Sequence, residues 1–277
     1  MRPLERMTFD WEGRPRAVLL ARPEGPGPFP LVFALHGTGG SPRLMAHLTG
    51  LPRLAHHAPF ILALPAALGE QGTDDFSRAA AWNAGPGFGC PGYQDSDDLG
   101  FLLALLDHLQ AASPVDPSRV YTCGFSNGGR MAYRLLFEAT HRFAACAVVA
   151  SAPGLPIPAH LPPRGVLIFH GTEDRYVPYQ GGVGPLGPSL PSPPVEETAY
   201  RLAQAMGADL KIQRHTLGPH VCRSAHAGEA EVTLWTVEGQ GHAWPGGRAW
   251  SSEAATPADD LPASDLIWTF FQGHTLP

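Results

Sequence analysis

The sequence predicts an α/β fold in one domain, with a mostly parallel central sheet and helices on both of its faces. Short apolar runs alternate along the chain with helical patterns, which is the order of elements expected of this class. Most of the runs are continuously apolar, as in parallel strands that are covered on both sides. The 277 residues show no internal repeat and no second domain, so we expect residues 1–277 to form a single domain.

The expected strands are the apolar runs 30–35, 59–65, 119–123, 144–150, 165–169 and 232–237. Segments with the 3.6-residue periodicity of amphipathic helices lie at 97–111, 195–206 and 264–272. Ser264 is a candidate N-cap of the last helix. Proline and glycine predict loops at 22–30, 152–164 and 181–194.

The composition is that of a globular protein, with 44% apolar and 16% charged residues. The net charge of -6 argues against nucleic acid as the main partner and offers no basic patch to a membrane surface. No apolar run approaches the ~20 residues of a membrane helix, so we expect no membrane insertion. Residues 1–22 lack the apolar core of a signal peptide, which predicts a cytoplasmic chain or one shown without its leader. The oligomeric state stays open.

A candidate nucleophile lies in residues 124–128, which read Gly-Phe-Ser-Asn-Gly, a G-x-S-x-G motif. An expected strand precedes the motif and a helical pattern follows it. In this setting the glycines permit a sharp turn that exposes the serine. We therefore expect Ser126 to be a nucleophile. The backbone N–H of Asn127, at the start of the helix, is placed to stabilise an oxyanion.

A serine nucleophile of this kind is followed along the chain by an acid and then by a histidine. Between Ser126 and the C-terminal histidines the only aspartates are Asp174 and Asp209. Active sites of open parallel sheets lie at the carboxyl ends of the strands. Asp174 follows the strand 165–169 at that end, whereas Asp209 precedes a strand at the opposite end. Asp174 is therefore the expected acid, with its neighbour Glu173 as the weaker alternative.

The candidate bases after Asp174 are His215, His220, His226, His242 and His274. His242 lies in a glycine-rich segment between the strand 232–237 and the last helix, where a catalytic histidine is needed. His215 lies in a strand pattern, and His274 lies in the tail. His220 and His226 lie in what we interpret as an irregular connection. His242 is therefore the expected base.

The loop after strand 30–35 reads His36-Gly37-Thr38-Gly39-Gly40. The second oxyanion donor of such a site comes from a loop in this place, where small residues leave a backbone amide accessible. The N–H of Thr38 is the first candidate, and that of Gly39 is the second.

Six segments together resemble the polyhydroxybutyrate depolymerase and feruloyl esterase-like family of α/β hydrolases: LHGTGG (35–40), WNAGPG (82–87), DDLGFLLALLD (97–107), YTCGFSNGGRMAYRL (121–135), HGTEDRYVPY (170–179) and GQGHAWPGG (239–247). The resemblance extends from Thr8 to about Gln272, and Ser126, Asp174 and His242 match the family's triad. It implies the α/β-hydrolase fold and a secreted or cell-envelope esterase. The implied substrates are polyester fragments, hydroxycinnamoyl esters or acetylated polysaccharide.

These residues predict acyl transfer in two steps, with no metal or organic cofactor. The expected partner is a small-molecule or polymer-derived ester, with feruloyl-type esters first and polyhydroxybutyrate oligomers as the alternative. An acetyl polysaccharide esterase, a peptidase and an inactive binding protein rank lower. Trp82 and Trp244 lie in segments expected near the serine. They are candidates to stack on an aromatic acyl group or sugar, and packing within their loops is an equal alternative.

The four cysteines have no C-x-x-C spacing, which argues against zinc or thioredoxin chemistry. Cys123 and Cys146 lie in apolar strand patterns and are expected to be buried thiols. Cys90 and Cys222 lie in expected loops that both border the active-site face, so they are candidates for a disulfide. Two free thiols are the equal alternative. A disulfide would favour an oxidising compartment and hence the extracellular location that the resemblance implies.

Overall fold

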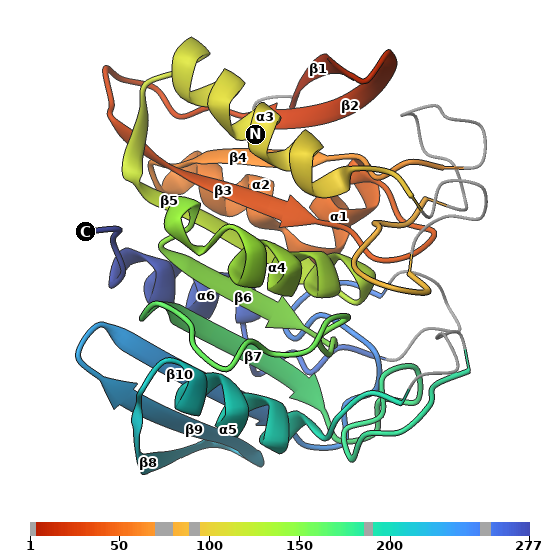
Figure 1. Cartoon of the computed structure of the whole chain (residues 1–277), viewed down its shortest axis with the longest axis vertical. Coiled ribbons are helices and arrows are strands. Elements are labelled where there is room, and N and C mark those ends of the chain that lie inside the picture. Colours follow the sequence, from red (N-terminus) through yellow and green to blue (C-terminus); the bar gives the residue numbers. More distant parts are fainter. Residues whose placement is uncertain (1–3, 70–79, 89–94, 186–190, 250–255) are drawn as a thin grey trace.

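A ten-stranded sheet runs through the described part of the chain, with helices on both of its faces (Figure 1). The computed structural model describes residues 4–69, 80–88, 95–185, 191–249 and 256–277. The strand order is β1-β2-β4-β3-β5-β6-β7-β10-β9-β8. The predicted α/β class, with one mostly parallel sheet between helices, is confirmed.

The strands are β1 (Glu5–Trp11), β2 (Arg14–Ala21), β3 (Phe29–Leu35), β4 (Ile61–Pro65), β5 (Val115–Phe125), β6 (Ala145–Val149), β7 (Gly165–Gly171), β8 (Asp209–Leu217), β9 (His220–Ala227) and β10 (Ala230–Val237). The central strands β4, β3, β5, β6, β7 and β10 are parallel. Antiparallel pairs extend the sheet at its edges, β2 and β1 on one side and β9 and β8 on the other. The carboxyl ends of the parallel strands therefore meet at one edge, where a site is expected.

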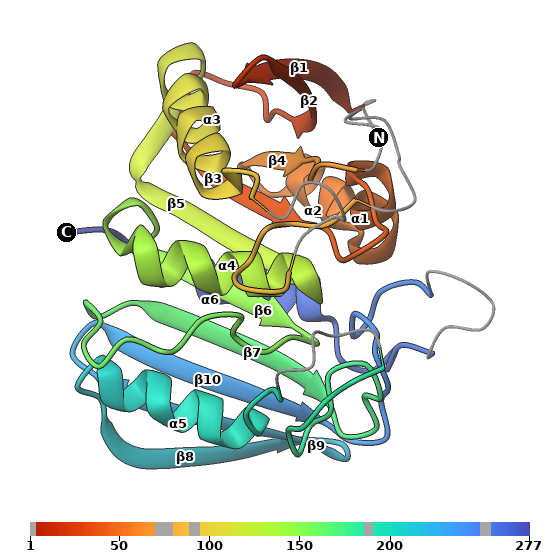
Figure 2. The ribbon, with the colours of Figure 1, turned by 45° about the vertical axis from the view of Figure 1, so that its right-hand side comes forward.

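Helices cover the two faces of the sheet in two groups (Figures 1 and 2). One face carries α3 (Asp98–Ala112), α4 (Asn127–Glu138) and α5 (Val195–Ala205). The other carries α1 (Pro42–Thr49), α2 (Leu51–His57) and α6 (Ala263–Gln272). None of the helices in the described ranges has the length and apolarity that would let it cross a membrane.

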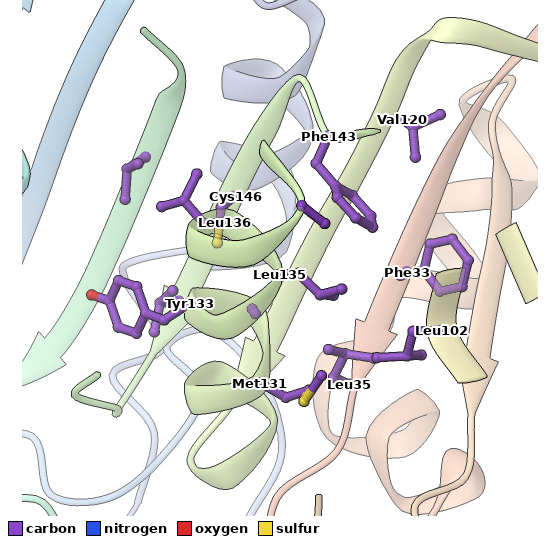
Figure 3. Packing of buried hydrophobic residues seen from close by; sticks show 14 of the residues in the cluster. Phe33, Leu35, Leu102, Val120, Met131, Tyr133, Leu135, Leu136, Phe143 and Cys146 are labelled. Atoms are coloured by element: carbon purple, nitrogen blue, oxygen red, sulfur yellow. The ribbon is translucent and has the colours of Figure 1, made fainter. Parts of the chain in front are cut away.

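Alternate residues of the central strands point into two separate hydrophobic cores. In β3, Phe33 and Leu35 belong to the core beneath α3 and α4, whereas Val32 and Ala34 belong to the core on the opposite side. Figure 3 shows the first core, where Met131 of α4 lies beside Leu35 of β3. Because both faces are covered, these strands contain no polar alternation, which is why they appear as continuous apolar runs.

The outer strands on both sides of the sheet differ from the expectation. The apolar runs did not reveal β1 and β2, and His220, Cys222 and His226 lie in the regular strand β9 rather than in an irregular connection. Strand β1 is exposed or half-exposed along its whole length. An edge strand with an uncovered face needs no continuous apolar run, so its sequence signal is weak. His215 does lie in a strand, β8, as predicted.

The start of α6 also differs. The helix begins at Ala263, so Pro262 occupies the N-cap position and the predicted N-cap role of Ser264 is wrong. Ser264 Oγ donates instead to the carbonyl of Thr49 at 2.6 Å and accepts the indole N–H of Trp244 at 3.0 Å. The serine thus connects α6 to the end of α1.

Candidate active site

Ser126 lies at the sharp turn between β5 and α4, with φ 54° and ψ -120°. A residue other than glycine adopts a positive φ only at a cost, so neighbouring bonds must hold it there. The Ser126 N–H donates to the carbonyl of Val149 at 3.0 Å, and its carbonyl accepts the hydroxyl of Ser151 at 2.7 Å. The turn therefore holds the serine at the carboxyl end of the parallel strands.

The two glycines of the motif are required by close packing. A Cβ atom on Gly124 would lie 2.2 Å from the carbonyl oxygen of Gly128. A Cβ atom on Gly128 would lie 2.1 Å from the carbonyl oxygen of Leu35. Helix α4 therefore begins in direct contact with β5 and with the end of β3, and the motif has a steric cause independent of its chemistry.

Asp174 and His242 are joined by a short hydrogen bond. Asp174 follows β7, and its Oδ2 accepts from Nδ1 of His242 at 2.7 Å. Its Oδ1 accepts the backbone N–H groups of Tyr176 at 2.8 Å and Val177 at 2.9 Å. Burial alone would raise the pKa of Asp174, but hydrogen bonds from His170 and His242 outweigh it and hold this pKa well below its usual range. The carboxylate is therefore ionised and orients the imidazole.

His170, which the sequence analysis did not single out, also contacts the acid. Its Nε2 donates to the carbonyl of Val177 at 2.8 Å and lies 3.4 Å from Oδ2 of Asp174. The side chain is fully buried near the end of β7. The sequence could have indicated this residue, because His170 lies four positions before Asp174 at the carboxyl end of the same strand.

The competing acids and bases lie elsewhere. Glu173 is exposed, and Asp209 begins the edge strand β8. Of the other histidines, His220 bonds to Asp260, and His274 Nδ1 contacts the carbonyl of Phe270. In the described part of the chain, only His242 among the five candidates lines the cavity beside Ser126.

This cavity has a volume of about 320 Å³ and contains Ser126, His242, Thr38 and Asn127 in its wall. The rest of the wall is largely apolar, with contributions from Leu44, Met45, Leu48, Phe88, Phe125 and Tyr176. The ring of His242 contacts two of these aromatic rings, with centroid separations of 4.9 Å to Phe125 and 5.2 Å to Tyr176. A mostly apolar cavity with a few convergent polar groups is the usual form of a small-molecule site.

The two candidate oxyanion donors in the loop after β3 differ in availability. The Gly39 N–H donates to the carbonyl of Ala80 at 2.8 Å, so it is not free to bind a ligand. Among the described residues, the N–H groups of Thr38 and Asn127 make no hydrogen bond, and both residues line the cavity. The first sequence candidate therefore fits the geometry, and the second does not.

His36 supports this loop from beneath. Its Nδ1 donates to the carbonyl of Gly37 at 2.8 Å, and its Nε2 accepts the N–H of Ala67 at 3.0 Å. Burial lowers the pKa of His36 to about 4, so the ring is neutral at pH 7. The loop thus rests on a neutral imidazole whose two nitrogens are both bonded.

Of the two alternatives for Trp82 and Trp244, the structure fits packing within their loops and not stacking on a ligand. Trp82 is 0% exposed and donates its indole N–H to the carbonyl of His36 at 3.0 Å. The Asn127 side chain bonds to both the N–H and the carbonyl of Trp82, at 2.7 Å and 3.1 Å. Trp244 is 2% exposed and bonds to Ser264. Neither lines the cavity, so both indoles support loops rather than stack on a ligand.

The cysteine predictions have mixed outcomes. Cys123 and Cys146 are buried in β5 and β6, as expected. Cys222 is buried in β9, so its predicted loop position is wrong. Cys222 is a free thiol, so the candidate disulfide with Cys90, a residue outside the described ranges, is wrong and the free-thiol alternative fits.

Comparisons with known proteins identify relatives of this chain. No family model matches it. It is 33% identical over 94% of its length to "Putative esterase NocK" of Nocardia uniformis subsp. tsuyamanensis and covers 80% of that protein. It is also 29% identical to feruloyl esterase B of Piromyces equi, over 59% of this chain and 31% of that enzyme.

Solved structures with the same fold include esterases. An acetyl xylan esterase from Aspergillus awamori superposes with a TM-score of 0.66 at 15% identity, covering 98% of this chain and 100% of the other. A thermostable esterase superposes with a TM-score of 0.59 at 16% identity, covering 98% of this chain and 63% of the other. At such low identity these likenesses support the fold, and the sequence relatives carry the activity. The chain therefore belongs to the esterase family of α/β hydrolases that includes NocK, and is a carboxylic ester hydrolase.

Proposed function

We propose that this esterase uses Ser126 as its nucleophile, His242 as general base and Asp174 as the acid that orients the base. The observation that carries the proposal is the 2.7 Å hydrogen bond from His242 to buried Asp174, because His242 shares a cavity with Ser126. Because the Nδ1–H of His242 donates a hydrogen bond to Asp174, the neutral ring carries no proton on Nε2, as a general base requires. The strained backbone at Ser126 supports the same role.

The reaction follows as two acyl transfers. His242 Nε2 removes the proton of Ser126 Oγ, and Oγ attacks the ester carbonyl to form a tetrahedral intermediate. The imidazolium then returns the proton to the departing alcohol oxygen as the carbonyl–oxygen bond breaks. A water molecule, deprotonated by His242, attacks the acyl-enzyme and releases the carboxylic acid and free Ser126. The described residues form no hydrogen bond between Ser126 Oγ and His242, and such bonds often close only when substrate binds.

The N–H groups of Thr38 and Asn127 serve as the oxyanion hole. Both are unpaired and line the cavity, so they lose no existing bond when an oxyanion forms. Asn127 is the first residue of α4, where the helix dipole adds favourable partial charge. His36 and the Asn127 side chain hold these two segments in place from behind the cavity.

The substrate we propose is a small ester, with feruloyl-type esters first. A cavity of about 320 Å³ suits a small ligand, and its aromatic wall offers Phe88 and Tyr176 to an aromatic acyl group. Feruloyl esterase B is among the relatives. Short polyhydroxybutyrate oligomers are the alternative taken from the sequence resemblance.

Ser126→Ala tests the mechanism. We expect kcat for p-nitrophenyl acetate to fall by about 10⁴-fold or more, because triad members act as a unit. An aryl phosphonate should label the Ser126 peptide of the wild-type protein in mass spectrometry. Ser118→Ala is the matched control, since Ser118 bonds to Asp116 in β5 away from the cavity. Near-wild-type hydrolysis by Ser126→Ala would end the proposal.

Rates for methyl ferulate, a hydroxybutyrate trimer and an anilide measured side by side test the substrate class. We expect methyl ferulate to have the highest kcat/KM of the three. Preference for the trimer would favour the alternative substrate, and preference for the anilide would identify a peptidase. No hydrolysis of any ester would indicate an inactive binding protein.

A further inference from the structure

One charged side chain in the cavity wall takes no part in the proposed acyl transfer. Arg130 lies one helical turn after Ser126 in α4, lines the same cavity and is only 7% exposed. Arginines this buried are normally matched by a carboxylate, because an unpaired charge is costly to remove from water. Within the described ranges, no carboxylate forms an ion pair with Arg130.

Neutral groups hold the guanidinium instead. Nη1 of Arg130 donates to the carbonyl of Ala152 at 3.0 Å and to that of Pro153 at 3.4 Å, while Nη2 contacts Ser192 Oγ at 3.4 Å. The ring of Phe88 lies 4.3 Å from Cζ, measured to the ring centroid. These contacts fix the guanidinium plane without a carboxylate in contact. Burial lowers the pKa of Arg130 to about 10, although the charges of Tyr133 and Asp174 act in the opposite direction.

Part of the guanidinium stays available to a ligand. Its Nε–H makes no hydrogen bond within the described residues, and Nη2 has a second N–H beyond the one directed at Ser192. In the described part of the chain, the solvent-inaccessible polar side-chain atoms without a hydrogen-bond partner belong to Trp11, Thr122, Tyr133 and His170. Nε of Arg130 is not one of these atoms, so it remains accessible to solvent. Nε and Nη2 share one edge, and that edge matches the two oxygens of a carboxylate.

We propose that Arg130 binds a carboxylate carried by the substrate, so that the enzyme selects small anionic esters over neutral ones. This inference rests on the proposed function, because it describes an ester bound at Ser126. The Cα atoms of residues one helical turn apart are separated by about 6 Å, and helical side chains lean toward the N-terminus. The carboxylate therefore lies only a few bonds from the ester carbonyl.

That carboxylate has two chemical positions. It lies on the acyl side in a monoester of a dicarboxylic acid, and on the alcohol side in a hydroxycinnamoyl ester of a hydroxy acid. The second class keeps the aromatic acyl group of the proposed substrate and adds the anion that Arg130 binds.

Matched substrate pairs test the proposal. The acyl-side pair is the 4-nitrophenyl monoester of adipic acid and its neutral primary-amide analogue. The alcohol-side pair is the feruloyl ester of 4-hydroxybutyrate and its primary amide. We expect wild-type kcat/KM to favour the carboxylate by about 10- to 100-fold in at least one pair, the range of a charge-assisted hydrogen bond that is lost. Equal rates within both pairs would overturn the proposal while leaving the esterase function intact.

Variants assign the preference to its residue. Arg130→Met should reduce the ratio of kcat/KM for the carboxylate to that for the amide to about one. Arg130→Lys should retain part of the preference, because lysine keeps the charge but cannot form the two parallel hydrogen bonds of a guanidinium. Arg201→Met is the control for net charge, since Arg201 is exposed on α5 and pairs with Glu197. A wild-type ratio in Arg130→Met, or an equal loss toward both members of a pair, would assign Arg130 a structural role and overturn the proposal.

Inhibition of the wild-type protein needs no folded variant. Adipic acid monoamide at neutral pH should inhibit hydrolysis of p-nitrophenyl acetate with a constant at least about tenfold lower than adipamide, which lacks the anion. Equal inhibition by the two compounds would contradict anion recognition. If wild type hydrolyses none of the esters, the proposed function itself has failed, and this inference fails with it.

Discussion

Acid should destabilise this protein through the buried imidazole of His36. The ring is 1% exposed, donates to Gly37 and accepts from Ala67, so the folded state offers no partner for a second ring proton. The pKa of His36 is lowered to about 4, whereas an exposed histidine titrates at about 6.5. As the pH falls, the unfolded chain binds the proton first. The stabilising contribution is therefore complete above pH ~6.5 and is lost progressively as the pH falls toward ~4.

The size of the effect follows from the two pKa values. A pKa of about 4 in the folded state against about 6.5 in the unfolded state corresponds to about 3 kcal/mol, most of which is lost by pH 4.5. Because the ring is fully buried, solvent does not screen the difference. His36→Asn removes the titrating group and keeps a small side chain that both donates and accepts hydrogen bonds.

Urea unfolding at pH 7.0 and pH 4.5, followed by tryptophan fluorescence, measures this loss. The wild-type free energy of unfolding should fall by about 2 kcal/mol more than that of His36→Asn between the two pH values. His56→Asn is the control, because His56 is exposed at the end of α2 and should leave the wild-type pH dependence in place. Parallel losses in wild type and His36→Asn would refute the reasoning.

Three further predictions concern the site and its support. Asp174→Asn should leave the fold intact and lower kcat by about 10⁴-fold, because it favours the wrong imidazole tautomer. Asp209→Asn, at the sheet edge, should change kcat little. The reverse result would contradict the assignment of the acid. Because the pKa of Asp174 is held well below its usual range, the acid limb of the kcat/KM profile should keep a slope of one below about pH 4, where an ordinary aspartate would add a second proton, and a slope of two there would count against this. Gly128→Ala should lower the free energy of unfolding by about 3 kcal/mol or more, since its Cβ would lie 2.1 Å from a carbonyl oxygen of β3. Gly207→Ala, where only the positive φ opposes a side chain, should cost about 1–2 kcal/mol in the same urea titration, and equal losses would contradict the steric argument.

The central sheet and the order of the candidate triad were predictable because local patterns carry them. Strands covered on both faces must be apolar throughout, and helices covered on one face must repeat every 3.6 residues. Parallel strands place all their carboxyl ends at one edge, which selected Asp174 over Asp209 without any knowledge of distances. Strand β9, which lies between β10 and the edge strand β8, escaped detection because its sequence shows no continuous apolar run.

The sequence by itself determined the α/β class, the turn at Ser126 and the selection of Asp174 and His242, since these depend on local patterns and on the order of segments along the chain. Only the tertiary structure decided which groups are free to meet a substrate. The carbonyl of Ala80 accepts the N–H of Gly39, whereas the N–H of Thr38 has no hydrogen bond among the described residues. Ala80 and Gly39 are 41 residues apart in the chain (80 − 39). Likewise, the indole N–H of Trp82 donates to the carbonyl of His36, so the indole lies outside the cavity wall. Such pairings arise from the packing of segments distant in the chain, and no local periodicity records them.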